Sequence, residues 1–207
     1  MLSPHISSIM KKGRGSQKMG EREKWDARYG ARDLAHSLEP SEFLSSNVNL
    51  LPRGGRALDL ASGEGRNSLY LAGLGFHVVA LDISTRALEK CLSAARAGGL
   101  KLDAVAGDLS NFVMPEGMFD VVVVFNYLRR SLAPSIIRSL GQGGVLVYET
   151  FTKDHLRWKP GFNPEFLLER GELAGLFPGL RVIKYREATL KGRGSDRAVA
   201  SLIAKKD

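Results

Sequence analysis

The sequence has one cysteine, few histidines and no long apolar run. The single Cys91 excludes an intrachain disulfide, and the four histidines lack the spacing of a metal-ligand set. No apolar stretch approaches the roughly 20 residues needed to cross a bilayer. We therefore expect no metal site and no membrane span, and the low cysteine content indicates a reducing, cytoplasmic location.

Positive charge is concentrated near the beginning of the chain. The formal net charge is +8, and residues 11–24 hold six Lys or Arg against two Glu. Such a segment could contact nucleic acid or an anionic membrane, or it could be a solvated leader. We expect residues 1–20 to form a basic, disordered leader without a secretory signal, ahead of a single domain at residues 21–207.

Strand-like and helix-like patterns alternate along the chain from residue 52 onward. The predicted strands are residues 56–61, 77–82, 101–108, 119–128 and 145–151. The predicted helices are residues 66–74, 84–99 and 131–140. Strands that alternate with helices indicate an α/β fold with right-handed crossovers and a mostly parallel, doubly wound sheet.

The end of the chain has a different pattern. Residues 180–190 and 197–206 are two strand-like runs, and the six residues between them leave no room for a helix. These two runs are therefore predicted to form an antiparallel hairpin.

A short loop follows the first predicted strand, in "LDLASGEGRNSLYLA" at residues 58–72. Its glycines let a ligand approach the backbone, and the amides of the following helix attract a carboxylate or phosphate. Asp59, Asp82 and Asp108 fall at or just after the carboxyl ends of three predicted strands, where ligands of open α/β sheets bind. Asp82 could accept both hydroxyls of a ribose, so we expect a ligand that contains a nucleoside.

Two classes of cofactor fit that outline. A dinucleotide motif needs a third glycine, and Ser68 stands at that position. The acid inside the first strand, Asp59, suits a ligand that carries its own positive charge. The sulfonium and ammonium of S-adenosylmethionine meet that condition better than a nicotinamide dinucleotide does.

Several segments resemble the ordered motifs of class I S-adenosylmethionine-dependent methyltransferases. "ALDLASGEGRNSLYLA" resembles the first motif, D-x-G-x-G-x-G, with Ala61 in place of its first glycine. The later segments "ALDIS", "AGDLS" and "FDVVVVFNYL" resemble the second, third and fourth motifs. From about residue 56 the chain is more narrowly similar to the tellurite-resistance methyltransferase family and its relatives.

The resemblance implies a seven-stranded sheet in the order 3-2-1-4-5-7-6, with residues 25–30 in a helix over the cofactor. It also implies that Asp82 binds the ribose, that Asp108 accepts from the adenine amino group, and that the Leu109 amide meets the ring. The expected cofactor-binding residues are Asp59, Ala61, Ser62, Gly63, Gly65, Arg66, Asp82, Ile83, Asp108, Leu109 and Asn126.

The residues that act on the methyl acceptor are less defined by the sequence. Methyl transfer mainly requires alignment of two reactants, and a general base is needed only if the nucleophile must lose a proton. Asn126, Tyr127, Glu149 and His155 are candidates, and each is also an ordinary polar residue for its position.

The sequence therefore predicts an S-adenosylmethionine-dependent methyltransferase with a small-molecule acceptor. One alternative is a methyltransferase that acts on RNA or protein, guided by the basic leader. Another is a module that binds the cofactor without turnover.

Overall fold

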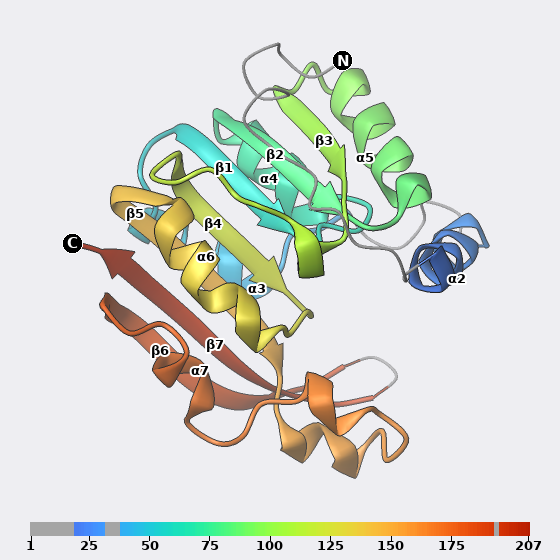
Figure 1. Cartoon of the computed structure of the whole chain (residues 1–207), viewed down its shortest axis with the longest axis vertical. Coiled ribbons are helices and arrows are strands. Elements are labelled where there is room, and N and C mark those ends of the chain that lie inside the picture. Colours follow the sequence, from blue (N-terminus) through green and yellow to red (C-terminus); the bar gives the residue numbers. More distant parts are fainter. Residues whose placement is uncertain (1–18, 32–37, 193–194) are drawn as a thin grey trace.

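The computed structural model describes residues 19–31, 38–192 and 195–207, and its centre is a seven-stranded sheet (Figure 1). The strand order is β3-β2-β1-β4-β5-β7-β6. The strands are β1 (Gly55–Leu60), β2 (Phe76–Asp82), β3 (Leu102–Ala106), β4 (Phe119–Phe125), β5 (Leu140–Phe151), β6 (Leu180–Leu190) and β7 (Arg197–Lys206). The first five strands are parallel, and β7 is antiparallel to both β5 and β6. The predicted strand order and C-terminal hairpin are confirmed.

Helices cover both faces of the sheet. They are α2 (Met19–Gly30), α3 (Glu42–Ser45), α4 (Arg66–Gly73), α5 (Thr85–Ala97), α6 (Ala133–Ser139) and α7 (Glu172–Gly175). Alternate valines of β4 point to opposite faces: Val122 and Val124 pack on the side of α6 and α7, whereas Val121 and Val123 pack on the side of α3 and α4. An almost unbroken apolar strand is therefore buried on both faces, as expected for a central strand of such a sheet.

The fifth strand begins five residues earlier than the predicted residue 145, because the glycine-rich residues 141–144, which are typical of a turn, are part of β5. Phe119 pairs with Leu140, and the register shifts before the regular pairing of β4 with β5 resumes. A Cβ at Gly144 would lie 3.0 Å from the Phe119 carbonyl oxygen, so glycine lets the two strands stay paired across the irregularity. The helix predicted at residues 131–140 is correspondingly shorter, since α6 covers only Ala133–Ser139.

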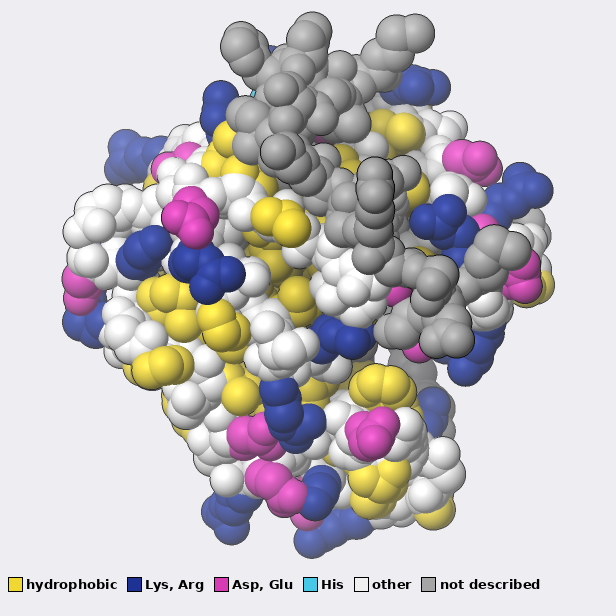
Figure 2. Space-filling view, viewed as in Figure 1, with side chains coloured by type: hydrophobic (Ala, Val, Ile, Leu, Met, Phe, Trp, Pro, Cys, Tyr) yellow, Lys and Arg dark blue, Asp and Glu magenta, His cyan; other side chains and the backbone are white. Residues whose placement is uncertain are grey.

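The surface mixes apolar and charged side chains. The face in Figure 2 shows hydrophobic side chains interspersed with Lys, Arg, Asp and Glu. On the edge strand β6, the exposed Val182 and Ile183 are flanked by Arg181 and Lys184, and such charges discourage pairing with another strand. Among the helices of the described residues, none is long and apolar enough to cross a membrane.

The glycine loop packs directly against α5. Gly65 adopts a φ of +82°, which side chains rarely tolerate, and a Cβ there would overlap the sulfur of Cys91. Cys91 is fully buried, and burial raises the pKa of its thiol to about 12. The thiol is therefore neutral and acts as a small apolar group.

We predict that Gly65→Ala destabilises the fold through two effects. The left-handed backbone should account for about 1–2 kcal/mol, and the overlap with Cys91 should add about 1–3 kcal/mol. Gly75→Ala is the matched control, because Gly75 has a φ of +94° but a Cβ added there would meet nothing within 4 Å. The free energy of unfolding in urea measures both changes, and equal losses in the two variants would contradict the packing argument.

Candidate active site

The acids at the carboxyl edge of the sheet lie on three neighbouring strands. Asp59 lies in β1, Asp82 ends β2, and Asp108 follows β3 by two residues. Asp59 and Asp82 are only 2% and 6% exposed. The parallel pairing of β1, β2 and β3 brings the three acids to one edge of the sheet, as predicted.

Asp59 is a buried acid with one direct side-chain partner. The Ser68 hydroxyl donates to Asp59 Oδ2 at 2.6 Å. The pKa of Asp59 is raised to about 7, chiefly by burial and to a smaller extent by the Asp82 charge, although the Ser68 hydrogen bond opposes the rise. Ser68, which stands where a dinucleotide motif has its third glycine, thus has a role that the sequence analysis missed.

Asp82 ties the glycine loop to the end of β2. Its Oδ2 accepts from the Gly63 amide at 2.8 Å, and its Oδ1 accepts from the Ser84 amide at 2.8 Å. Burial raises the pKa of Asp82, whereas hydrogen bonds from the Ser84, Gly63 and Ile83 amides oppose the rise. Each carboxylate oxygen can accept a second hydrogen bond, so both oxygens can still receive a ribose hydroxyl.

The glycine loop has an unusual backbone conformation. Ala61 adopts a φ of +57°, so it takes the left-handed conformation that suits the glycine usual at this position of the motif. The Ser62 amide donates to the Leu81 carbonyl at 3.1 Å. Within the described part of the chain, the buried Ser62 hydroxyl has no hydrogen-bond partner. A bound ligand could provide one, as expected for a polar loop that faces a cofactor.

Helix α2 lies against α5 and over the glycine loop (Figure 1). Asp26 accepts from the Ser84 hydroxyl at 2.6 Å and from the Arg86 amide at 3.1 Å. Tyr29 covers Gly63 so closely that a Cβ there would lie 2.8 Å from the Tyr29 hydroxyl oxygen.

Lys90 of α5 links α2 to the glycine loop. Lys90 Nζ donates to the Tyr29 carbonyl at 2.6 Å and contacts Glu64 Oε1 at 2.8 Å. The helical position of residues 25–30 was predicted, but the contacts of Asp26 and Lys90 were not. No local pattern of the sequence points to this role of Asp26, because 58 residues separate it from Ser84 at the start of α5.

The remaining predicted residues follow β3 and β4. Asp108 Oδ1 accepts from the Ser110 amide at 2.8 Å, and Leu109 is buried. Asn126 has a φ of +56°, and its backbone N–H donates to the Glu149 backbone carbonyl at 2.9 Å. The carbonyl of Tyr127 accepts from the Tyr148 hydroxyl at 2.8 Å, and burial raises the pKa of the Tyr127 phenol.

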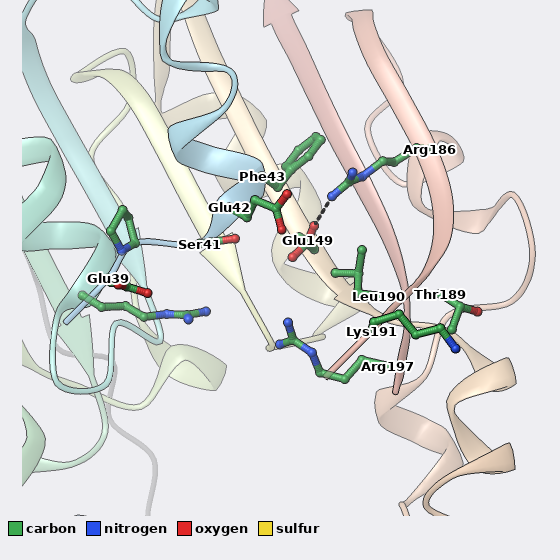
Figure 3. A pocket seen from close by; sticks show the side chains of 12 residues that line it. Glu39, Ser41, Glu42, Phe43, Glu149, Arg186, Thr189, Leu190, Lys191 and Arg197 are labelled. Carbon is green, nitrogen blue, oxygen red and sulfur yellow. Dashed lines mark hydrogen bonds and ion pairs between the residues drawn. The ribbon is translucent and has the colours of Figure 1, made fainter. Parts of the chain in front are cut away.

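A cavity of about 420 Å³ opens beside the glycine loop, between α3, the start of α4 and the β6–β7 hairpin (Figure 3). Arg66 and Glu149 line it, so it joins one predicted cofactor residue to one predicted catalytic candidate. Glu149 is only 5% exposed, accepts from the Ser201 hydroxyl at 2.6 Å and forms an ion pair with Arg186 at 3.4 Å. Arg186 in turn stacks on the Phe43 ring.

His155 has different surroundings from the other candidates. Its ring stacks on Phe151 with 4.5 Å between centroids and meets the edge of Phe162. Burial lowers the pKa of His155, and its Nδ1 has no hydrogen-bond partner among the described residues. This placement gives His155 a packing role, and it is not among the residues that line the cavity.

Comparison with known proteins shows what the segment that holds this site is similar to. Residues 57–144, from β1 into β5, match a family model described as a methyltransferase domain. The chain is therefore similar to class I S-adenosylmethionine-dependent methyltransferases, in sequence over this segment and in fold over most of its length. The glycine loop and Asp82 both lie in the matched segment.

Two curated proteins and one crystal structure illustrate the similarity. The probable S-adenosyl-L-methionine-dependent methyltransferase TehB of Haemophilus influenzae is 27% identical over 139 residues, which cover 64% of this chain and 48% of TehB. A Pyrococcus horikoshii tRNA (uracil(54)-C(5))-methyltransferase is 32% identical over 139 residues, which cover 59% of this chain and 33% of that protein. The TehB crystal structure aligns with a TM-score of 0.66 and 20% identity, over 90% of this chain and 67% of TehB.

The chain thus spans between a third and a half of these curated relatives. The crystal structure of TehB shares the fold of this chain.

The described residues of the site fit S-adenosylmethionine, the cofactor of the similar enzymes. S-adenosylmethionine offers hydroxyl and ammonium donors and a sulfonium charge, and the site offers the buried carboxylates Asp59 and Asp82. The unpartnered Ser62 hydroxyl adds a polar atom in the loop beside them. A cationic ligand near two buried carboxylates also offsets part of the desolvation of those charges.

We predict that the affinity for S-adenosylhomocysteine rises as the pH increases from about 6 to about 8. The pKa of Asp59 is about 7 without ligand, and the ammonium of the ligand favours the carboxylate, so binding is full above that pKa and weakens below it. Calorimetry in buffers of different ionisation enthalpy should show proton release near pH 7. In the Asp59→Asn variant this release should vanish. An unchanged release in that variant would contradict the assignment to Asp59.

Proposed function

We propose that the methyltransferase domain transfers a methyl group from S-adenosylmethionine to a small molecule held in the cavity beside the glycine loop. The observation that carries the proposal is the position of Arg66. It is the first residue of α4, directly after the loop, and its side chain lines the cavity together with Glu149 at the end of β5. The acceptor chamber therefore begins where the cofactor loop ends.

The cofactor supplies an electrophilic methyl group, and the chain supplies binding and alignment. Asp82 holds the ribose, Asp108 and Leu109 hold the adenine, and Asp59 with the loop residues holds the methionine end. Helix α2 covers Gly63 of the loop through Tyr29. Alignment of the two reactants accounts for most of the rate in such a displacement.

Glu149 is the residue that we propose as general base for an acceptor that must lose a proton. Its carboxylate lines the cavity, and Ser201 and Arg186 fix its position. A carboxylate held by two hydrogen bonds keeps one orientation, which favours proton transfer along a single direction.

A small-molecule acceptor is favoured by the size of the cavity. Its volume of about 420 Å³ lies in the range of sites for small ligands. The free and buried Cys91 agrees with the cytoplasmic location that we propose for such an enzyme.

One alternative acceptor, RNA, is favoured by a specific observation, because one relative is named as a tRNA methyltransferase. The basic leader that would contact RNA lies mostly outside the described residues. Salt-dependent RNA binding that is lost on deletion of residues 1–18 would support this alternative.

The first test is calorimetric titration of the full chain with S-adenosylhomocysteine, with NAD as the control ligand. We expect micromolar binding of the first ligand and none of NAD. Asp82→Asn should weaken binding by about 10-fold or more, because a charged acceptor for the ribose hydroxyls is lost.

Asp103→Asn is the matched control for that substitution. Asp103 lies in the neighbouring strand β3 and forms its ion pair with His77 instead of contacting the loop. Its loss should leave the affinity unchanged. Absence of any S-adenosylhomocysteine binding by the wild-type chain would overturn the proposed function, and cofactor binding without turnover across a broad acceptor panel would indicate the non-catalytic module.

A further inference from the structure

The cavity holds two arginines that face the same space from opposite sides. Arg66 begins α4, and Arg197 begins β7. Figure 3 shows the Arg197 side chain pointing into the cavity from the hairpin. Arg66 is largely buried, and its pKa is lowered first by burial and next by the positive charge of Arg197. Asp59 and Glu149 oppose these effects but are weaker influences than Arg197.

The other cations of the cavity already have anionic partners. Arg186 pairs with Glu149 at 3.4 Å, and Lys191 pairs with Asp196 at 2.8 Å. In the described ranges, neither Arg66 nor Arg197 forms a side-chain hydrogen bond or an ion pair. Glu39 and Glu42 also line the cavity, but both are exposed to solvent. Two guanidinium groups that face one partly buried space repel each other unless an anion lies between them.

We propose that the methyl acceptor is a small organic acid whose carboxylate binds between Arg66 and Arg197. The proposal rests on the proposed function and names the substrate class of the same cavity. The planar forks of two guanidinium groups match the two oxygens of a carboxylate. Phe43 and Leu190 add apolar surface to the wall for the rest of the acceptor.

The carboxylate could in principle come from the methionine end of the cofactor. The position of Arg197 favours the carboxylate of the acceptor. Arg197 begins β7, and β4 and β5 separate β7 from β1 and its glycine loop. With strands about 4.8 Å apart, the start of β7 lies roughly 14 Å across the sheet from β1. The loop amides and the start of α4 remain available for the methionine carboxylate.

The experiment is a titration of the full chain, saturated with S-adenosylhomocysteine, with benzoate as probe and benzamide as its neutral counterpart. We expect saturable, millimolar binding of benzoate and much weaker binding of benzamide. Arg197→Gln should lower the affinity for benzoate by about 10- to 100-fold. Its affinity for S-adenosylhomocysteine should stay unchanged.

Arg181→Gln is the matched control. It removes the same charge from the same hairpin, at an exposed site where Arg181 pairs with Asp207. Benzoate binding should be unaffected in this variant. Arg197→Lys provides a second variant at the site itself, and it should retain part of the affinity because it keeps the charge but loses the fork.

Three outcomes would overturn the proposal. Equal binding of benzoate and benzamide, or absence of benzoate binding, shows that the cavity does not select an anion. Weaker binding of S-adenosylhomocysteine to Arg197→Gln, with unchanged binding of 5′-methylthioadenosine, assigns the anion to the methionine end of the cofactor. If the wild-type chain fails to bind S-adenosylhomocysteine, the proposed function fails as well. In the other outcomes the wild-type chain still binds S-adenosylhomocysteine, and only the assignment of the anion site fails.

Discussion

The carboxylate of Asp82 is the contact on which the rest of the site depends. It accepts from the Gly63 amide on one oxygen and from the Ser84 amide on the other, so it joins the glycine loop, the end of β2 and the start of α5. Ser84 then caps α5 by accepting from the Ala87 amide and donates its hydroxyl proton to Asp26 of α2. One buried acid therefore positions the loop, a helix and the segment that covers the loop.

The two parts of the site differ in their charged side chains. On the β1, β2 and β3 side, the buried acids Asp59 and Asp82 lie near α2. On the β5 and β7 side, the cavity is lined by four cations, Arg66, Arg186, Lys191 and Arg197, and by three acids, Glu39, Glu42 and Glu149, of which only Glu149 is buried. The division falls where the strand order reverses between β1 and β4, the position at which ligands bind in open α/β sheets. A cationic cofactor and an anionic acceptor would each meet charge of the opposite sign.

Local patterns in the sequence were sufficient for much of the architecture. The apolar run of β4, the acids at the ends of β1 and β2, and the hairpin all follow from residue spacing within one element. The contact of Asp26 with Ser84 spans 58 residues, and the approach of Arg66 to Arg197 spans more than twice that distance along the chain. Such contacts depend on how helices and strands pack against one another, and the local hydrophobic pattern of the sequence does not encode that packing. The early start of β5 was missed for a related reason, since its glycines are typical of turns until the partner strand is known.

Ser84 links helix α2, which covers the glycine loop, to the carboxylate of Asp82, which holds that loop. If α2 moves away, the Ser84 hydroxyl loses its acceptor on Asp26 while its backbone amide still serves Asp82. Opening of α2 would therefore change the hydrogen bonding of Ser84, whose amide donates to the carboxylate that is expected to hold the ribose. Trp25 stacks with Tyr29 on this same helix, so α2 carries a native fluorophore. Any displacement of α2 on entry of a nucleoside would therefore be coupled to the binding equilibrium and would change the emission of Trp25.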